Sequence, residues 1–177
     1  MLVYFLRHAS AGQNKKNSEL DARRPLDENG IEQCKVVGRA LAATGVEVDE
    51  IISSPLTRAA QTATRVAHQI GFSREIRHNP VLATEGDLAQ FRALLKSYAD
   101  RDAIMVVGHN PSLSRFLSLL LSGGSNDSML ELKKGAIAKV EFDARRRASL
   151  YWCITPKLVG ALQEGATRSS RPKTSRK

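Results

Sequence analysis

Short apolar runs that end in polar or charged residues recur along this chain, and the first run constrains the fold most. Residues 2–6 (LVYFL) are apolar and favour β-structure, which is typical of a strand buried on both faces. Arg7 and His8 follow at once. In an open α/β sheet the carboxyl ends of the strands border the crevice where ligands bind. The run therefore predicts a buried parallel strand that ends in a charged pair at the functional edge of a sheet.

After this run the chain alternates between strand-like and helix-like patterns. Helices are expected at residues 28–44, 55–70, 87–98 and 111–121. Two of them follow Ser54 and Asn110, which precede prolines and are expected as N-caps. Further strands are expected at residues 51–52, 75–77, 103–107, 136–142 and 149–154, the last two as a hairpin. Residues 10–26 lack periodicity and are expected to form a loop. The alternation predicts a three-layer α/β/α sandwich with a mainly parallel central sheet.

The length and composition favour a single globular domain over residues 1–160. A chain of 177 residues with 42% hydrophobic content can bury a proper core. Its apolar runs are too short for a secretory signal or a bilayer span. Cys34 and Cys153 are too few for a disulfide framework and show no zinc-site spacing with histidine. We expect a cytoplasmic protein with no cofactor and no membrane partner.

The net charge of +9 raises the question of nucleic-acid binding, but the distribution of the charge argues against it. Residues 161–177 carry five Lys or Arg and one Glu, so +4 lies in this segment. The segment is rich in Ser and Thr and has no apolar period, which predicts a basic, disordered tail. Aromatic residues make up only 5% of the chain, and no basic helix is interleaved with them, so base-stacking platforms are not expected.

Three strand ends bring chemically active residues to one edge of the predicted sheet. They are residues 7–8, residues 53–58 and residues 108–111, and the last two lead into helix N-termini with free N–H groups and a positive dipole end. Arg58 falls in a first helical turn, where the dipole disfavours a cation by a few tenths of a kcal/mol. This placement suggests that an anion binds there. No carboxylate is evident near His8 or His109 to complete a metal site.

Two arginines and two histidines at one edge favour phosphoryl-transfer chemistry. Guanidinium groups match phosphate oxygens bidentately. A neutral imidazole can attack phosphorus and form a covalent intermediate, while a second imidazole and the arginines stabilise the transferring group. The residues therefore predict metal-independent phosphoryl transfer through a phosphohistidine. A non-enzymatic alternative is a phosphate-binding interaction module, which would not need the nucleophile His8.

The same residues resemble the motifs of the histidine phosphatase superfamily, also called phosphoglycerate mutase-like. The resemblance rests on residues 6–9 (LRHA), 53–63 (SSPLTRAAQTA) and 106–111 (VVGHNP). Within this superfamily the chain resembles the SixA-type phosphohistidine phosphatases in its short length and in several residues. These are residues 21–26, Gly30, Trp152 and residues 155–157. The resemblance extends over about residues 1–157 and implies a phosphoglycerate mutase-like fold.

The resemblance also implies roles for individual residues. It makes His8 the phosphorylated nucleophile, and Arg7, Arg58 and His109 the residues that bind the phosphoryl group. Ala9 stands where the family most often has glycine, a small-for-small difference.

The general acid is left open between two interpretations. Many members of the superfamily take it from a carboxylate that follows a segment matching residues 81–87 here, which makes Glu85 the candidate. Alternatively Glu85 is a solvated loop residue, and Asp87 is a helix N-cap. SixA-type enzymes have less need for a strong acid, because the imidazole of phosphohistidine leaves more readily than an alkoxide. Arg24 either lines the phosphate site or ties down its own loop, and the loop role is favoured.

The expected substrate is phosphohistidine on a signalling or phosphorelay protein. Larger superfamily members that act on metabolites often insert a capping segment between the Arg58 helix and the His109 strand, and this chain has no room for one. An open site admits a phosphorylated residue on a protein surface and offers few contacts to a small metabolite. A small-molecule phosphomonoesterase of the same superfamily is the alternative.

Overall fold

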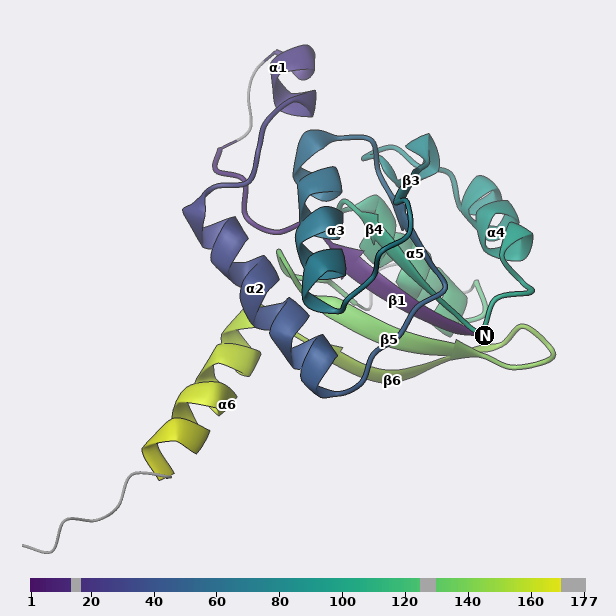
Figure 1. The fold of residues 1–177 in the computed structure, drawn as a ribbon. Coiled ribbons are helices and arrows are strands. Elements are labelled where there is room, and N and C mark those ends of the chain that lie inside the picture. The colour runs from purple at the N-terminus through teal and green to yellow at the C-terminus, as the bar shows by residue number, and fades with distance from the viewer. Residues whose placement is uncertain (14–16, 125–129, 170–177) are drawn as a thin grey trace, which may run out of the picture.

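One mixed sheet of six strands forms the centre of the molecule, in the order β3–β2–β4–β1–β5–β6 (Figure 1). The computed structural model describes residues 1–13, 17–124 and 130–169. The strands are β1 (Leu2–Arg7), β2 (Glu50–Ser53), β3 (Arg77–His78), β4 (Ala103–Gly108), β5 (Ile137–Phe142) and β6 (Ala148–Ile154). The first four run parallel, and β5 and β6 form an antiparallel hairpin. The predicted α/β class with a mainly parallel sheet is confirmed.

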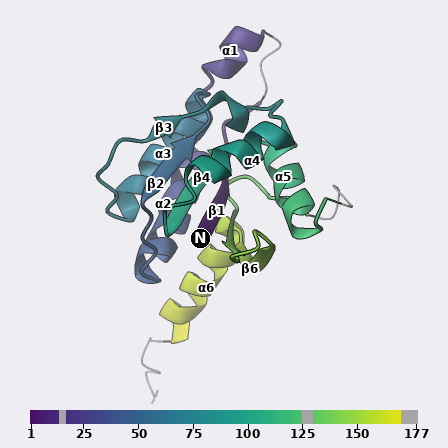
Figure 2. The same cartoon turned by 90° about the vertical axis from the view of Figure 1, so that its right-hand side faces the viewer.

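Helices cover both faces of this sheet, as Figure 2 shows from the side. They are α1 (Ser18–Ala22), α2 (Glu28–Ala43), α3 (Thr57–Gln69), α4 (Leu88–Ser97), α5 (Ser112–Leu121) and α6 (Pro156–Ser169), with a 3-10 turn at Pro80–Leu82. Alternate residues of β1 pack on opposite faces. Val3 and Phe5 belong to the core cluster under α4 and α5, whereas Tyr4 and Leu6 belong to the cluster under α2 and α3.

The register of the parallel strands aligns the ends that carry the predicted site. Arg7 at the end of β1 lies opposite Gly108 at the end of β4. Ser53 at the end of β2 lies opposite Val107. The next residues of the three strands, which include His8 and His109, therefore emerge together at one edge of the sheet.

Two helices begin later than expected, because the side chains expected to cap them form hydrogen bonds with other parts of the protein. α3 begins at Thr57 and α5 at Ser112, after Leu56 and Pro111, neither of which makes a side-chain cap hydrogen bond. Ser54 instead contacts His109. The Asn110 amide group donates to the Leu132 carbonyl and accepts from Ser114. The short edge strand is likewise shifted, to Arg77–His78.

The segment expected as a loop contains the short helix α1. Asn17 caps it by accepting a hydrogen bond from the backbone N–H of Leu20. A single helical turn is too short to show an apolar period, and none of the residues of α1 is buried. Sequence periodicity therefore had no signal by which to find it.

The expected disordered tail is corrected in part, because residues 161–169 form the second half of α6. Thr155 accepts from the backbone N–H of Leu158 at the start of this helix, and Val159 is buried. This anchored first turn lets the helix continue into the segment that follows. Residues 170–177 lie outside the described part of the chain. Cys153 is exposed, whereas Cys34 is buried in the core. Within the described residues, no helix is long and apolar enough to cross a membrane.

Candidate active site

His8 and His109 stand side by side at the carboxyl edge of the sheet. Their ring centroids are 4.8 Å apart and their planes are inclined by 45°. Both side chains are buried, with exposed fractions of 7% for His8 and 1% for His109. The backbone N–H of His8 donates to the Gly108 carbonyl at 2.9 Å, which continues the β1–β4 ladder to the residue before His109. The sheet itself thus fixes the spacing of the two imidazoles.

The His8 ring is held in one tautomer. Its Nδ1 lies 2.7 Å from the Ala9 carbonyl oxygen, which can only accept, so Nδ1 carries the proton. Burial lowers the pKa of His8 to about 3, opposed by the bond to Ala9 and reinforced by the charges of Arg58 and Arg7. His8 is therefore neutral at physiological pH, with the lone pair of Nε2 free to act as a nucleophile.

His109 is oriented by Ser54. Its Nε2 lies 2.9 Å from Ser54 Oγ, and that oxygen already accepts from the backbone N–H of Leu56 at 3.2 Å. Ser54 can donate its hydroxyl proton to His109 Nε2, and in that tautomer the imidazole proton of His109 lies on Nδ1. Burial first, then His8 and the two arginines, lower the pKa of His109 to about 2. His109 is thus neutral, and in the tautomer in which Ser54 donates to Nε2 it is a donor through Nδ1.

Arg58 lies in the first turn of α3, as predicted, and its charge is balanced by a residue that the sequence did not reveal. Its NH1 donates to the Asp21 carbonyl at 2.9 Å and lies 3.3 Å from Asp21 Oδ2. The sequence predicts an anion beside Arg58, and the carboxylate of Asp21 lies beside its NH1 group. The charge of Asp21 also acts on His109 and opposes the lowering of its pKa. Burial lowers the pKa of Arg58.

Arg7 reaches the same site from the end of β1. Its NH1 donates to the Leu132 carbonyl at 2.7 Å and lies 4.0 Å from the exposed carboxylate of Glu131. Both guanidiniums act on the two histidines, because each lowers the pKa of His8 and of His109. The structure thus brings together His8 and the three residues that the sequence singled out with it, Arg7, Arg58 and His109.

Three nitrogen donors around His8 are buried and have no hydrogen-bond partner among the described residues: Arg7 Nε, Arg58 Nε and His109 Nδ1. Buried polar groups are nearly always hydrogen-bonded in native proteins, and a cluster of exceptions calls for an explanation. Two of the three belong to cations and the third to an imidazole beside the free Nε2 of His8. This donor set suits an oxyanion such as a phosphoryl group.

Asp21 and Arg24 organise the loop that borders Arg58. Arg24 Nε donates to Asp21 Oδ1 at 2.9 Å, and Arg24 NH1 donates to the Ala11 carbonyl at 2.6 Å. Arg24 therefore ties the loop down, which was the favoured interpretation. Asp21 joins this loop to Arg58. In the sequence Asp21 stands out only as part of residues 21–26, one of the similarities to the SixA-type branch, because the surrounding segment has no periodicity.

Glu85 is not brought into contact with the histidines. Its side chain is exposed, and it makes no hydrogen bond or ion pair with the other described residues. Its neighbour Thr84 accepts from Ser112 Oγ, which places this segment beside the start of α5. Asp87 is the N-cap of α4 and accepts from the backbone N–H of Gln90. In the described part of the chain, no group of three His, Cys, Asp or Glu side chains could hold a metal ion.

Comparison with known families gives a match at the part of the chain that carries the first two motifs. Residues 3–84 match the model of the histidine phosphatase superfamily (branch 1). An uncharacterised protein of Picosynechococcus sp. is 34% identical over 149 residues, which cover 82% of this chain and 88% of that protein. The phosphohistidine phosphatase SixA of Escherichia coli is 27% identical over 158 residues, which cover 88% of this chain and 94% of SixA.

A solved structure supports the same relationship across the whole fold. The structure of the protein histidine phosphatase SixA complexed with tungstate superposes with a TM-score of 0.79 at 25% identity, covering 90% of this chain and 99% of SixA. Fold, motifs and sequence similarity agree, so the chain belongs to the histidine phosphatase superfamily, and its similarity to SixA supports the SixA-type branch.

Proposed function

We propose that this phosphatase hydrolyses phosphohistidine on signalling or phosphorelay proteins, through a phospho-His8 intermediate and without a metal ion. In this proposal Arg7, Arg58 and His109 bind the phosphoryl group. The observation that carries it is the set of three buried, unpartnered donors around a neutral His8. The compartment that we propose is the cytoplasm.

The reaction proceeds in two displacements at phosphorus. In the first, the Nε2 lone pair of His8 forms a bond to phosphorus as the P–N bond of the substrate breaks, and the substrate imidazole leaves with that electron pair. In the second, a water oxygen attacks the same phosphorus, the bond to His8 breaks, and inorganic phosphate is released with the proton that the water gives up. Arg7, Arg58 and His109 Nδ1 would donate hydrogen bonds to the equatorial oxygens, where charge accumulates.

Two observations favour phosphohistidine over a phosphate ester. An imidazole leaves as a neutral group when its second nitrogen is protonated, so it needs no strong acid, and Glu85 is exposed and without a contact to the histidines. The chain between α3 and β4 holds only β3, the 3-10 turn and α4, with no further helix or strand to cap the site. The SixA relatives, one of them complexed with tungstate, an oxyanion that resembles phosphate, add to this support.

Trapping the intermediate tests the mechanism. The enzyme is mixed with a protein that carries radiolabelled phosphohistidine and quenched with base. We expect label on the enzyme that survives base and is lost in acid, as a phosphohistidine is. His8→Ala should abolish the label, and His68→Ala, which removes an exposed histidine of α3, should retain it. Label that persists in His8→Ala would overturn the assignment of the nucleophile.

Substrate preference is tested separately with the unmodified enzyme. We expect kcat/KM to be higher for a phosphohistidine-bearing protein than for each member of a panel of phosphorylated metabolites, with activity unchanged by EDTA. A clear preference for a metabolite would favour a small-molecule phosphomonoesterase and leave the His8 mechanism intact. Phosphate binding without any turnover would favour an interaction module. Loss of activity in EDTA would contradict metal independence.

A further inference from the structure

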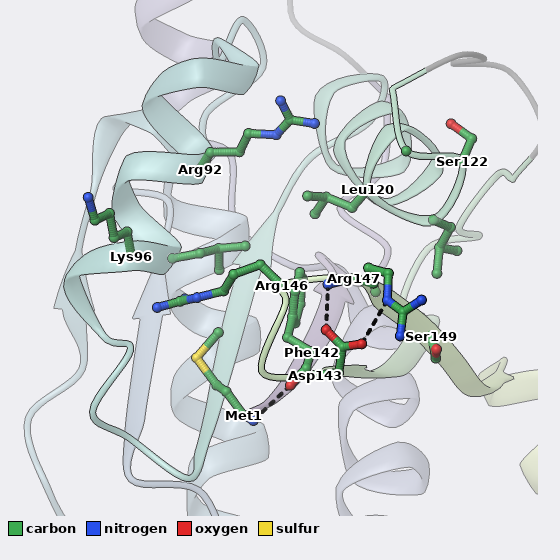
Figure 3. A pocket seen from close by; sticks show the side chains of 14 residues that line it. Met1, Arg92, Lys96, Leu120, Ser122, Phe142, Asp143, Arg146, Arg147 and Ser149 are labelled. Carbon is green, nitrogen blue, oxygen red and sulfur yellow. Dashed lines mark hydrogen bonds and ion pairs between the residues drawn. The ribbon is translucent and has the colours of Figure 1, made fainter.

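A large cavity lies at the end of the molecule opposite the histidine site. Its volume is about 960 Å³, and it is bordered by Met1, α4, the end of α5 and the turn between β5 and β6 (Figure 3). β1 runs from this cavity to the histidine site, and its six residues span roughly 20 Å at about 3.3 Å each. The cavity is therefore separate from the site proposed for the phosphoryl group.

The floor of this cavity is apolar and continuous with the core. Leu95 and Phe142 line it and belong to the core cluster under α4 and α5. Other lining residues are only partly buried and pack against that cluster: Met1, Leu120, Leu121 and Ala148. Cavities of about 300–1,000 Å³ with mainly apolar walls are typical of sites for small organic molecules. The size and the floor together favour a ligand with an apolar body.

The rim of the cavity is cationic. Arg92 and Lys96 lie one turn apart on α4, and Arg146 and Arg147 lie in the turn between β5 and β6. The carboxylate among the lining residues is that of Asp143, which accepts from Arg147 Nε at 2.8 Å and from two backbone N–H groups of its own turn. The side chains that line the opening, four cations and one carboxylate, together carry a charge of +3.

Three of these cations have no ion pair with any described residue: Arg92, Lys96 and Arg146. Figure 3 shows Arg92 reaching from α4 toward the end of α5, and Arg146 reaching from the hairpin turn toward α4. Arg146 has a φ of 61°, the left-handed conformation that residues other than glycine seldom adopt. The turn thus directs a cation across the apolar floor from the side opposite to Arg92.

We propose that this cavity binds a small amphiphilic anion, with an acyl or aromatic body on the apolar floor and one anionic group between α4 and the hairpin turn. The apolar floor argues against a free inorganic anion, because such an ion would leave it uncovered. The unpaired cations argue against an uncharged apolar ligand, because that ligand would leave them without a counter-charge. The proposal concerns a second site and does not depend on the substrate of the first.

Calorimetric titration of the full chain with octanoate tests this directly. Octanoate carries one carboxylate on a linear acyl body, whereas octanol lacks the charge and acetate lacks the body. We expect octanoate to bind with a stoichiometry of one, and octanol and acetate to bind at least about tenfold more weakly, a difference of about 1.4 kcal/mol. Equal affinity for octanol, or equal affinity for acetate, would overturn the proposal.

A charge-reversal variant locates the site. The double substitution Arg92→Glu and Lys96→Glu should weaken octanoate binding at least about tenfold and leave phosphatase activity unchanged. The control is Arg39→Glu with Lys157→Glu, which makes the same change in net charge at exposed positions of α2 and α6 and should leave the affinity unchanged.

Each other outcome of these titrations contradicts the proposal. Unaltered binding by the Arg92→Glu, Lys96→Glu variant would place the octanoate elsewhere. An equal loss of octanoate affinity in the control variant would mean that the net charge of the protein, and not the position of the two cations, determines binding. A hexaglutamate peptide that binds the unmodified chain more tightly than octanoate would identify the rim as a docking surface for acidic segments of proteins instead.

Discussion

At the scale of single residues, the hydroxyl group of Ser54 has a larger part in the site than its position in the sequence suggests. It contacts His109 Nε2 and accepts from the Leu56 backbone, and it is fully buried. Ser54→Ala removes the partner of His109 Nε2 and lets the imidazole change tautomer or rotate. The loss of one hydrogen bond is worth about 0.5–1.5 kcal/mol, so we expect kcat/KM to fall by about twofold to about thirteenfold.

The neighbouring serine provides the matched control. Ser53 Oγ donates to the Ser54 carbonyl and is equally buried, so Ser53→Ala removes a similar hydroxyl that does not contact His109. Steady-state kinetics and the NMR signals of the His109 ring, compared for the two variants, separate a positioning role from general packing. Similar losses in both variants would argue against the role of Ser54.

The two site histidines also predict how stability depends on pH. Their pKa values in the folded protein are about 3 for His8 and about 2 for His109, against 6.5 for a free side chain. Below pH 6.5 the unfolded chain therefore takes up protons that the folded protein does not. The free energy of unfolding should fall as the pH drops from 6.5 toward 3, and these groups should add no pH dependence above that window.

Thermal melts across this window test the prediction. His8→Asn keeps a polar side chain but cannot titrate, so its Tm should fall less steeply than that of the unmodified protein between about pH 7 and pH 4.5. His68→Asn changes an exposed histidine and should keep the original slope. If His8→Asn kept the original slope as well, His8 would not be held neutral in the folded state.

At the scale of elements, α2 approaches the loop after His8 so closely that only glycine fits. A Cβ on Gly30 would overlap the Ser10 carbonyl group, which accepts from the backbone N–H of Asp27. Forced overpacking costs about 1–3 kcal/mol, and each kcal/mol shifts Tm by about 2–4 °C at this size. We therefore expect Gly30→Ala to lower Tm by roughly 2–12 °C.

Gly160→Ala is the control for that measurement. Gly160 is also in a helix, but nothing lies within 4 Å of an added Cβ, so the substitution should keep or slightly raise Tm. Differential scanning calorimetry of both variants measures the difference. A Gly30→Ala protein as stable as Gly160→Ala would show that the loop after His8 moves aside without cost.

The elements also show which parts of the site the sequence could reveal. β1 and β4 are continuous apolar runs, so their ends, and with them His8 and His109, were predictable from the sequence alone. The starts of α3 and α5 were not, because Ser54 and Asn110 have good capping side chains that bond to His109, Leu132 and Ser114 instead. Tertiary contacts of this kind leave no periodic pattern in the chain.

Asp21 was missed for a related reason. It lies in a helix of five residues with no buried side chain, and its partner Arg58 is 37 residues away in sequence. A pair of opposite charges at that separation is indistinguishable from many others in the sequence. Only the fold shows that this carboxylate neutralises the arginine that was expected to bind an anion.

At the scale of the whole molecule, α6 divides the C-terminal segment into an anchored part and an exposed part. Val159 is buried with an exposed fraction of 7%, whereas Leu162 is 66% exposed. Truncation after Ala161 should therefore leave Tm almost unchanged. Truncation after Thr155 also removes Val159 and should lower Tm by several degrees, because burial of such a side chain is worth about 1.5–3 kcal/mol.

Circular dichroism melts of the two truncated proteins make this comparison. A large loss of Tm on removal of residues 162–177 would mean that this segment packs on the domain. Equal stability of the protein that ends at Thr155 would mean that α6 contributes nothing to the core under α2.

The central place of β1 in the sheet has a consequence for local opening of the structure. β1 is bonded on one edge to β4 and on the other to β5, so its amide hydrogens reach water only when the sheet as a whole comes apart. α1, by contrast, has no buried residue and is joined to the domain through the polar contacts of Asp21 with Arg58 and Arg24. The loop beside Arg58 therefore depends on a few polar contacts, whereas the strand that ends at His8 is held by the whole sheet, which keeps its imidazole in one orientation.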